Sequence, residues 1–234
     1  MRVTFDNSHN RAQNAPMLAV APRTSKSEMT RAAIVGAALD IALLEGLEAI
    51  SLQAVADRVG LSKSGVFSRV GSREALQSAV IGEYDRRFLA DVFVPAMQAP
   101  KGLPRLSAMV RRWIERVRVV EANTGCLYAA GAFELDDREG PLREQLLRGV
   151  LGWRAALRRV ILQAVEQGHL RADCDVEQTV GEIYSMMIGM VHDARFMRDP
   201  RAAEHAHTAF ERLIRSLTAG ASAPVTHPAP AVTT

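Results

Sequence analysis

The stretch that decides the fold of this chain reads Ser51-Leu-Gln-Ala-Val-Ala-Asp-Arg-Val-Gly-Leu-Ser-Lys-Ser-Gly-Val-Phe-Ser-Arg69. It holds two short segments with the apolar spacing of helices, joined at Gly60. Ala56 provides a small residue where two steeply crossing helices touch, and Gly60 tolerates the positive φ of a tight turn. The pattern predicts a helix-turn-helix whose small core contains Val55, Leu61 and Val66.

Helical periodicity continues on both sides of this stretch, and no segment shows the sustained alternation of a β-strand. A helix from about Thr30 to Glu45 precedes it and stops at Gly46. Ser72 caps a long helix that follows it, and further helices are expected over residues 104–120, 125–135, 141–167, 176–197 and 200–217. The sequence therefore predicts an all-α chain of about nine helices, with three short ones before the long ones.

The ends of the chain lack this periodicity. Residues 1–26 mix Asn, Ser, Pro and Arg, and residues 219–234 are mostly Ala, Pro, Thr and Ser, so both are predicted to be disordered. Between them we expect a helix-turn-helix domain over residues 27–76 and a larger helical domain over residues 77–218.

Composition sets broad limits. The chain has 234 residues, 48% of them apolar and 24% charged, which is ordinary for a folded globular protein. A net charge of +3 permits a nucleic-acid partner without demanding one. No apolar run reaches the roughly 18 residues of a membrane span and no export signal is recognisable, so we expect a cytoplasmic protein without a membrane partner.

Charge supports a nucleic-acid surface at the helix-turn-helix. Residues 58–73 contain four basic side chains and no acidic one, although Asp57 and Glu74 flank them. A local window free of acids suits a surface that faces phosphates. The second helix of the motif then fits the major groove of double-stranded DNA. Spacing alone leaves open a helical hairpin that merely packs.

Residues 30–80 resemble the DNA-binding domain of TetR/AcrR-type transcriptional repressors. The shared blocks, in order, are Glu45-Gly46-Leu47, Ser51-Leu-Gln-Ala-Val-Ala56, Val59-Gly60-Leu61-Ser62-Lys63, an aromatic at Phe67, and Gly71-Ser-Arg-Glu-Ala-Leu76. Downstream, Gly125-Cys126-Leu127, Phe133-Glu134 and Gly140-Pro141-Leu142-Arg143 are similar to a C-terminal domain found in some of these repressors.

The resemblance implies a homodimeric, ligand-responsive repressor that binds palindromic operator DNA and is released by a small-molecule effector. It implies base contacts from Lys63, Ser64 and Gly65, with Ser68 and Arg69 at the rim. It implies phosphate contacts from Thr30, Ser51, Gln53 and Arg73, and Ser62 and Phe67 complete the expected DNA-binding set. No catalytic residue, cofactor or metal is expected.

Three positions depart from the family pattern. Phe67 stands where a tyrosine is usual and loses its hydroxyl, Val70 stands where an aromatic is common, and Arg73 stands where a lysine is common. The first two keep an alternative open, a helical small-molecule-binding module with weakened or lost DNA binding. A helical enzyme is disfavoured because the sequence has no Walker loop, no Gly-rich dinucleotide turn and no HExxH motif.

In such repressors the C-terminal helices form a ligand pocket, and the last two pair with a second subunit. We expect the paired faces to come from residues 176–197 and 200–217, where the apolar residues are Val180, Ile183, Tyr184, Met187, Ile188, Val191, Ala203, Ala206, Phe210, Leu213 and Leu217. The pocket candidates are Met109, Trp113, Cys126, Tyr128, Phe133, Trp153, Met186, Met190 and Phe196; the alternative is that they fill the core.

The cysteines, two of the histidines and a group of arginines do not predict functional sites. Cys126 and Cys174 are too few for a disulfide framework and lack metal-ligand spacing. His205 and His207 are two residues apart and cannot share a helix face, so they do not predict a metal site. The arginines at 105, 111, 112, 116 and 118 are expected to form a solvated face, with an acidic ligand as the alternative.

Overall fold

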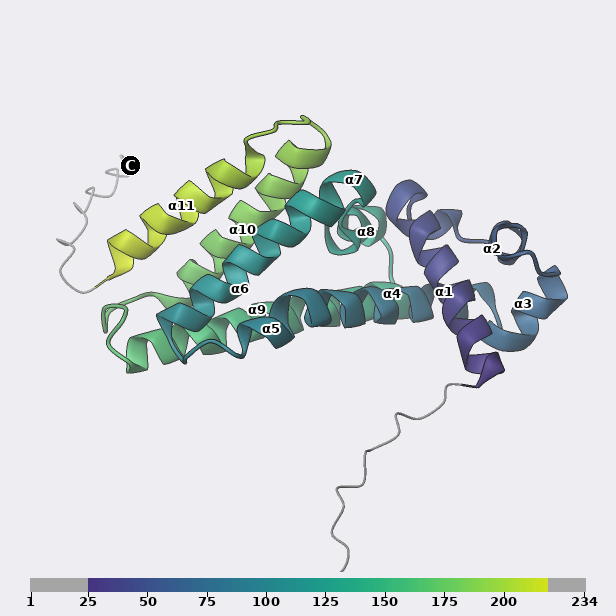
Figure 1. Cartoon of the computed structure of the whole chain (residues 1–234), viewed down its shortest axis with the longest axis horizontal. Coiled ribbons are helices and arrows are strands. Elements are labelled where there is room, and N and C mark those ends of the chain that lie inside the picture. Colours follow the sequence, from purple (N-terminus) through teal and green to yellow (C-terminus); the bar gives the residue numbers. More distant parts are fainter. Residues whose placement is uncertain (1–24, 219–234) are drawn as a thin grey trace, which may run out of the picture.

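The computed structural model describes residues 25–218, and every regular element in that range is helical (Figure 1). The elements are α1 (Lys26–Glu45), the short 3-10 helix η1 (Leu47–Ala49), α2 (Leu52–Val59), α3 (Lys63–Val70), α4 (Arg73–Phe88), α5 (Val94–Ala96), α6 (Leu103–Arg116), α7 (Ala122–Thr124), α8 (Leu127–Leu135), α9 (Pro141–Glu166), α10 (Val176–Arg195) and α11 (Ala202–Leu217). The all-α prediction is confirmed.

Two π-helical segments make rods longer than the periodicity suggests. Leu89–Phe93 joins α4 to α5, and Val117–Glu121 joins α6 to α7, without a break in either rod. Counted as continuous rods, the described residues form the nine helices that the sequence predicts.

Helix α1 begins earlier than expected, which corrects both the predicted start at Thr30 and the predicted arm over residues 1–26. The Ser25 hydroxyl accepts a hydrogen bond from the Glu28 amide, and the Glu28 carboxylate accepts one from the Ser25 amide. This capping box fixes the helix start upstream of the apolar pattern. Thr30 is therefore not a cap, because its hydroxyl donates to the Lys26 carbonyl inside the first turns. The rest of the predicted arm and the predicted tail lie outside the described residues.

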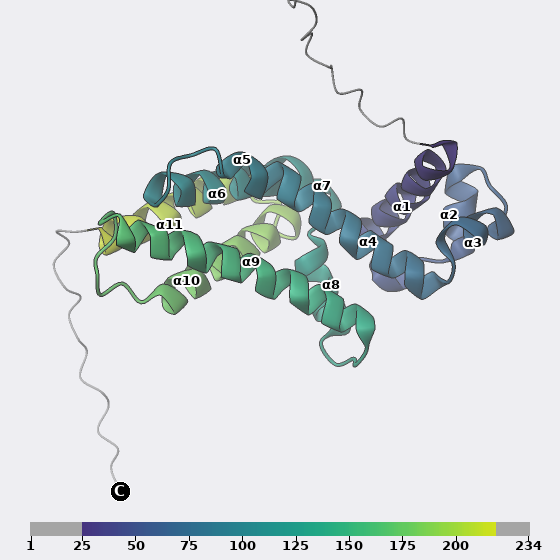
Figure 2. The same cartoon turned by 90° about the horizontal axis from the view of Figure 1, so that it is seen from below.

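The first three helices form the predicted helix-turn-helix unit at one end of the molecule (Figures 1 and 2). The Ser51 hydroxyl caps α2 and the Ser62 hydroxyl caps α3, and Gly60 between them has a φ of +67°. Val55, Ala56 and Val66 are fully buried, and Leu61 is half-buried against them. The short helices thus owe their geometry to two serine caps and one left-handed glycine.

Helix α4 belongs to both parts of the fold. It packs against α1 and also against α9 (Figure 2). The expected boundary between residues 76 and 77 therefore falls inside a continuous helix. The larger part of the molecule is completed by α6, which packs on α9 and α11, and by the antiparallel pair α10 and α11.

A buried ion pair sits where the two π-helical segments approach each other. Arg116 Nε donates to Glu121 Oε1 over 3.0 Å, and a second nitrogen of the same guanidinium binds Asp91. Glu121 is fully buried, and its carboxylate also accepts a hydrogen bond from the Tyr84 hydroxyl over 2.7 Å. Burial raises the pKa of Glu121, and the bonds from Tyr84 and Arg116 oppose that rise.

Arg116 therefore corrects the expectation of a solvated arginine face. Arg111, Arg112 and Arg118 are exposed, but Arg116 is buried and Arg105 donates to the carbonyls of Ala99 and Met97. Charge spacing did not reveal this, because Arg105 binds backbone carbonyls and the partners of Arg116 lie five and 25 residues away, outside the i, i+3 and i, i+4 pattern of a helix face.

We predict that Glu121→Ala lowers the free energy of unfolding by about 3 kcal/mol, because the Arg116 guanidinium stays buried without its main partner. Urea unfolding followed by circular dichroism measures the loss. Glu115→Ala removes an exposed partner of Arg118 and is the matched control, with a nearly unchanged midpoint expected. Equal and small effects of both substitutions would show that the buried pair does not stabilise this fold.

Candidate nucleic-acid interface and ligand domain

The outward face of α3 carries the predicted reading surface. Helix α3 turns Val66 into the core, and the side chains on its opposite face are therefore exposed. These are Lys63, Ser64, Phe67 and Ser68. α3 lies at the tip of the molecule, away from the C-terminal helices (Figure 1). Phe67 is 57% exposed, so an apolar ring occupies the centre of this face.

Most polar side chains of the predicted set already have local partners. Ser51 and Ser62 cap their helices, and Gln53 Nε2 donates to Asp57 over 2.8 Å. Ser68 and Arg69 both donate to the Gly65 carbonyl. Within residues 25–218 the Lys63 ammonium has no hydrogen-bond or ion-pair partner, so it is the cation of this face that needs no rearrangement before binding an acceptor.

Gly65 has a structural role that its sequence context did not show. A Cβ atom at this position would lie 3.1 Å from the Ser62 hydroxyl oxygen, which is the atom that caps α3. Gly65 is half-buried, and its amide is the donor to that cap. Alanine makes the same bond at the matching positions after Ser51 and Ser72, so Gly65 donates to the cap but the cap does not require a glycine.

Arg73 is placed differently from the expected phosphate contact. Its Nε donates to the Ile50 carbonyl over 2.7 Å, and its Nη2 donates to the Glu48 carbonyl over 2.6 Å and pairs with the Glu48 carboxylate over 3.3 Å. The guanidinium thus ties the start of α4 to the segment before α2. Spacing did not predict this, because a side chain that binds distant carbonyls leaves no periodic signal.

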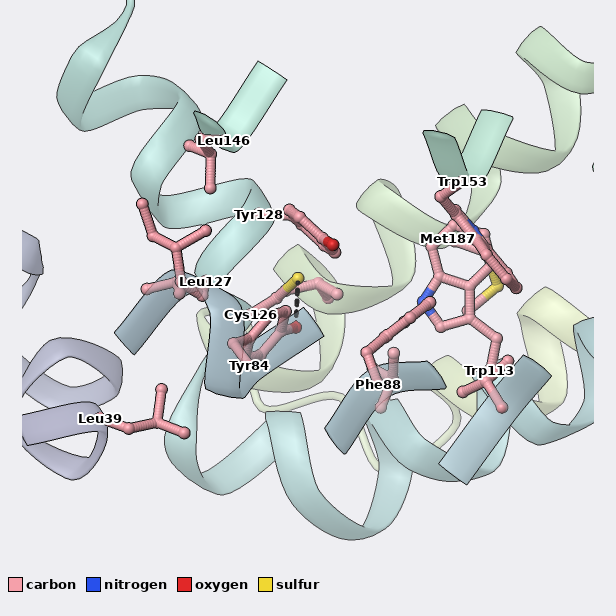
Figure 3. Packing of buried hydrophobic residues seen from close by; sticks show 14 of the residues in the cluster. Leu39, Tyr84, Phe88, Trp113, Cys126, Leu127, Tyr128, Leu146, Trp153 and Met187 are labelled. Carbon is pink, nitrogen blue, oxygen red and sulfur yellow. Dashed lines mark hydrogen bonds between the residues drawn. The ribbon is translucent and has the colours of Figure 1, made fainter. Parts of the chain in front are cut away.

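Four of the pocket candidates come together in a buried cluster in the C-terminal helices (Figure 3). The rings of Trp113 and Trp153 lie 5.3 Å apart and nearly perpendicular, and Phe88 lies edge-on to both. Tyr128 and Cys126 lie on the other side of Phe88, beside Tyr84 (Figure 3). We call Tyr84, Phe88, Trp113, Cys126, Tyr128 and Trp153 the aromatic cluster.

Three buried polar atoms at the aromatic cluster have no partner among the described residues. They are the indole nitrogens of Trp113 and Trp153 and the second carboxylate oxygen of Glu121. Buried donors and acceptors are almost always hydrogen-bonded in folded proteins. The cluster therefore has unused hydrogen-bonding capacity in an otherwise apolar interior.

Sequence reasoning missed Tyr84 and Phe88, although they are four residues apart on one helix and share a face. It also missed Glu121, which carries no periodic signal.

The other pocket candidates lie outside the aromatic cluster. Phe133, Met190 and Phe196 line an open groove of about 1120 Å³ between α8, α10 and the α10–α11 connection, while Met109 is buried in the core and Met186 is half-buried on α10.

The Cys126 thiol is unreactive in this buried environment. Burial raises the pKa of its thiol to about 12, and its sulfur lies 3.3 Å from the Tyr84 hydroxyl. Burial also raises the pKa of Tyr84 well above its usual value. A thiol in this environment stays protonated at neutral pH and is a poor nucleophile.

Residues 25–218 contain neither a metal-binding cluster nor a helix suited to a membrane. No group of three or more His, Cys, Asp and Glu side chains is placed to hold a metal ion. His205 approaches Asp199 and His207 approaches Glu211, so the two histidines have different partners. In the same range, no helix has the length and apolar character that crossing a membrane requires.

The C-terminal part of the chain matches a known protein family. Residues 102–210 match the family model of the tetracyclin repressor-like C-terminal domain. The C-terminal domain of this chain is therefore of the type found in TetR-family transcriptional regulators. This match begins at α6 and ends within α11. TetR-family regulators of similar structure have an N-terminal helix-turn-helix and a helical C-terminal domain, and this chain has the same arrangement.

Several solved structures share the fold of most of the chain, and some of them are TetR-family regulators. One from Cytophaga hutchinsonii is 20% identical, with a TM-score of 0.72, and covers 84% of this chain and 98% of its own. One from Chloroflexus aurantiacus is 22% identical, with a TM-score of 0.70, and covers 82% and 95%. A structure described as the basis for control of antibiotic production by bacterial hormones is 26% identical, with a TM-score of 0.64, and covers 82% and 98%. No curated protein matches the chain by sequence.

We predict that iodoacetamide at about pH 8 labels the half-buried Cys174 before the buried Cys126. Cys126 should react only after denaturation, because its thiol is buried and stays protonated. Peptide mass spectrometry after timed quenching measures both sites. Rapid labelling of Cys126 in the folded protein would contradict the packing of the aromatic cluster.

Proposed function

We propose that this chain is a homodimeric repressor that binds palindromic operator DNA through α3 and is released by a small-molecule effector. The observation that carries the proposal is the exposed α3 face, with an unpartnered Lys63, on a TetR-type helix-turn-helix. In this reading Lys63 and Ser64 contact base edges, and Ser68 and Arg69 contact the groove rim after Arg69 leaves the Gly65 carbonyl. Such a regulator acts in the cytoplasm.

The phosphate contacts are proposed to come from the start of α2. The Ser51 hydroxyl caps this helix, and Gln53 lies exposed in its first turn. Backbone amides at a helix start favour a phosphate, and side chains there supply further donors. Arg73 and Thr30 are left out of this set, because both are engaged inside their own domain.

The dimer is proposed to form through α10 and α11. Val180, Ile183, Met187 and Val191 on α10, and Ala206 and Phe210 on α11, are already buried within the protomer. The half-buried apolar residues left for a partner are Tyr184, Ile188, Ala203, Leu213, Ile214 and Leu217. Gly181 and Gly189 face open space, so a second helix has room to approach α10 closely.

The effector is proposed to bind at the aromatic cluster. A groove of about 320 Å³ between α4 and α9 is lined by Phe88, Tyr128 and Trp153, and this volume lies in the range of small-molecule sites. The rings favour a flat apolar molecule, and the unpartnered indole N–H of Trp153, which lines this groove, favours one with an acceptor oxygen. The similar structure concerned with bacterial hormones supports a response to small molecules.

A second candidate function follows from the exposed Phe67. A helical regulator that has lost DNA binding tolerates an apolar ring at the centre of its former reading face, whereas a DNA-binding one needs a base or sugar against it. The DNA-binding experiment separates the two.

We predict that the protein protects a palindromic site near its own gene in a footprinting experiment. The two protected half-sites should be centred about 34–36 Å apart along the DNA, which is one turn. Absence of any protected site favours the second candidate function, and protection of a single half-site contradicts pairing through α10 and α11.

On that site, Lys63→Ala should weaken binding about tenfold and reduce the slope of log affinity against log salt concentration by about one, because one cation leaves the interface. Fluorescence anisotropy over a salt series measures both quantities. The control is Lys101→Ala, a matched loss of charge in the loop before α6, which should leave both unchanged. Equal behaviour of the two variants would remove Lys63 from the reading face.

We predict that planar aromatic carbonyl compounds, such as flavones, raise the melting temperature of the protein and quench its tryptophan fluorescence. Gly152→Leu should abolish both effects, because a leucine there fills the α4–α9 groove, while the open space at Gly152 lets the variant fold. Gly82→Leu on the exposed side of α4 is the matched control and should keep both. Binding that survives Gly152→Leu would move the effector site away from the aromatic cluster.

A further inference from the structure

The corner between α1 and η1 is held by side chains of the C-terminal domain. Glu134, near the end of α8, points its carboxylate at this corner. One carboxylate oxygen accepts a hydrogen bond from the Leu47 amide over 2.9 Å, and the other accepts one from the Glu48 amide over 2.6 Å. Both amides belong to the first turn of η1, where backbone donors lack partners within the helix.

A second side chain reaches the same corner from α10. Arg195 Nη1 donates to the Asn123 carbonyl over 2.8 Å, and its Nη2 lies 3.5 Å from the Leu43 carbonyl in the last turn of α1. A cation thus faces the carbonyl end of α1 while an anion faces the amide start of η1. Both arrangements match the local backbone dipoles, so the two contacts reinforce one orientation of the corner.

Two glycines allow the domains to come this close. A Cβ atom on Gly46 would lie 3.1–3.3 Å from the Glu134 carboxylate, and one on Gly125 would lie 2.9 Å from the Leu43 carbonyl oxygen. Both glycines have φ values near +95°, which other residues rarely adopt. Close approach is therefore built into the backbone on each side of the contact.

Helix α8 connects this contact to the aromatic cluster. Tyr128 near its start packs against Tyr84 and Phe88, and Glu134 near its end holds η1. Because α8 is a short, continuous helix, a movement that displaces Tyr128 also displaces Glu134. The other bonds to η1 come from α4, where Gln77 and Arg73 bind the carbonyls of Leu47 and Glu48, and from Arg138 after α8, which pairs with the Glu48 carboxylate over 3.1 Å.

We propose that Glu134 is a positioning residue, through which α8 sets the orientation of the helix-turn-helix by holding the Leu47 and Glu48 amides. Its consequence for DNA rests on the function proposed above, whereas the contact itself does not. Glu134→Gln keeps the size of the side chain but offers only one acceptor oxygen, with an amide donor group facing one of the two N–H groups.

The first test is hydrogen exchange on the full-length protein without DNA or any small molecule. In Glu134→Gln the amides of Leu47 and Glu48 should exchange at least tenfold faster than in the unmodified chain, while the amide of Val55 in α2 keeps its protection. Glu139→Gln, in the exposed turn after α8, is the matched control and should change none of them. Unchanged exchange at Leu47 and Glu48 overturns the proposal.

The second test is DNA affinity over a salt series. Glu134→Gln should weaken binding about fivefold with an unchanged salt slope, because it loosens the reading head without removing a phosphate contact. A loss of slope, as expected for Lys63→Ala, would contradict a positioning role, and so would unchanged affinity together with faster exchange. Circular dichroism checks that the variant is folded.

Gly125→Ala provides an independent second variant, because it pushes against the Leu43 carbonyl without altering any charge. It should also speed exchange at Leu47 and Glu48, and unchanged exchange there counts against the contact. If the unmodified protein binds no DNA, the proposed function fails, while the exchange measurements still decide whether Glu134 holds the corner.

Discussion

The structure depends on α4, which packs against α1 at one end of a continuous core and against α9 at the other. Its buried residues Leu76, Val80, Tyr84 and Phe88 all belong to that core, and Tyr84 and Phe88 lie in the aromatic cluster. A helix of 16 residues is about 24 Å long, enough to serve both ends without a break. Because a packed helix moves as a rod, the two ends of the core cannot change their relative position without repacking one of them.

The C-terminal domain combines tight apolar packing with a few buried polar groups whose bonds are incomplete. Arg116 and Glu121 neutralise each other, yet one oxygen of Glu121 and two indole N–H groups have no partner among the described residues. Each unused group carries a desolvation cost that a suitable ligand offsets. The same arrangement that weakens the free domain therefore favours an occupied one, and α8 lies between this interior and the reading head.

Much of the fold followed from local signals. Serine caps at 51, 62 and 72, the aspartate cap at 175, glycine stops such as Gly46 and Gly60, and the apolar spacing between them predicted the helices and the helix-turn-helix, because these features act over a few residues. Side chains with distant partners were beyond that reasoning. Arg73, Arg116 and Glu134 bind groups brought near by the fold, and Ser25 and Glu28 form a cap ahead of any apolar pattern.

The burial of Val66 divides α3 into positions of two kinds. At residue 66 the side chain is fully enclosed by the core, so packing restricts the choice there. Lys63, Ser64, Phe67 and Ser68 project away from the core and are free of that restriction. In the proposed regulator these outer side chains can be exchanged, and with them the preferred DNA sequence, while the helix that presents them stays intact.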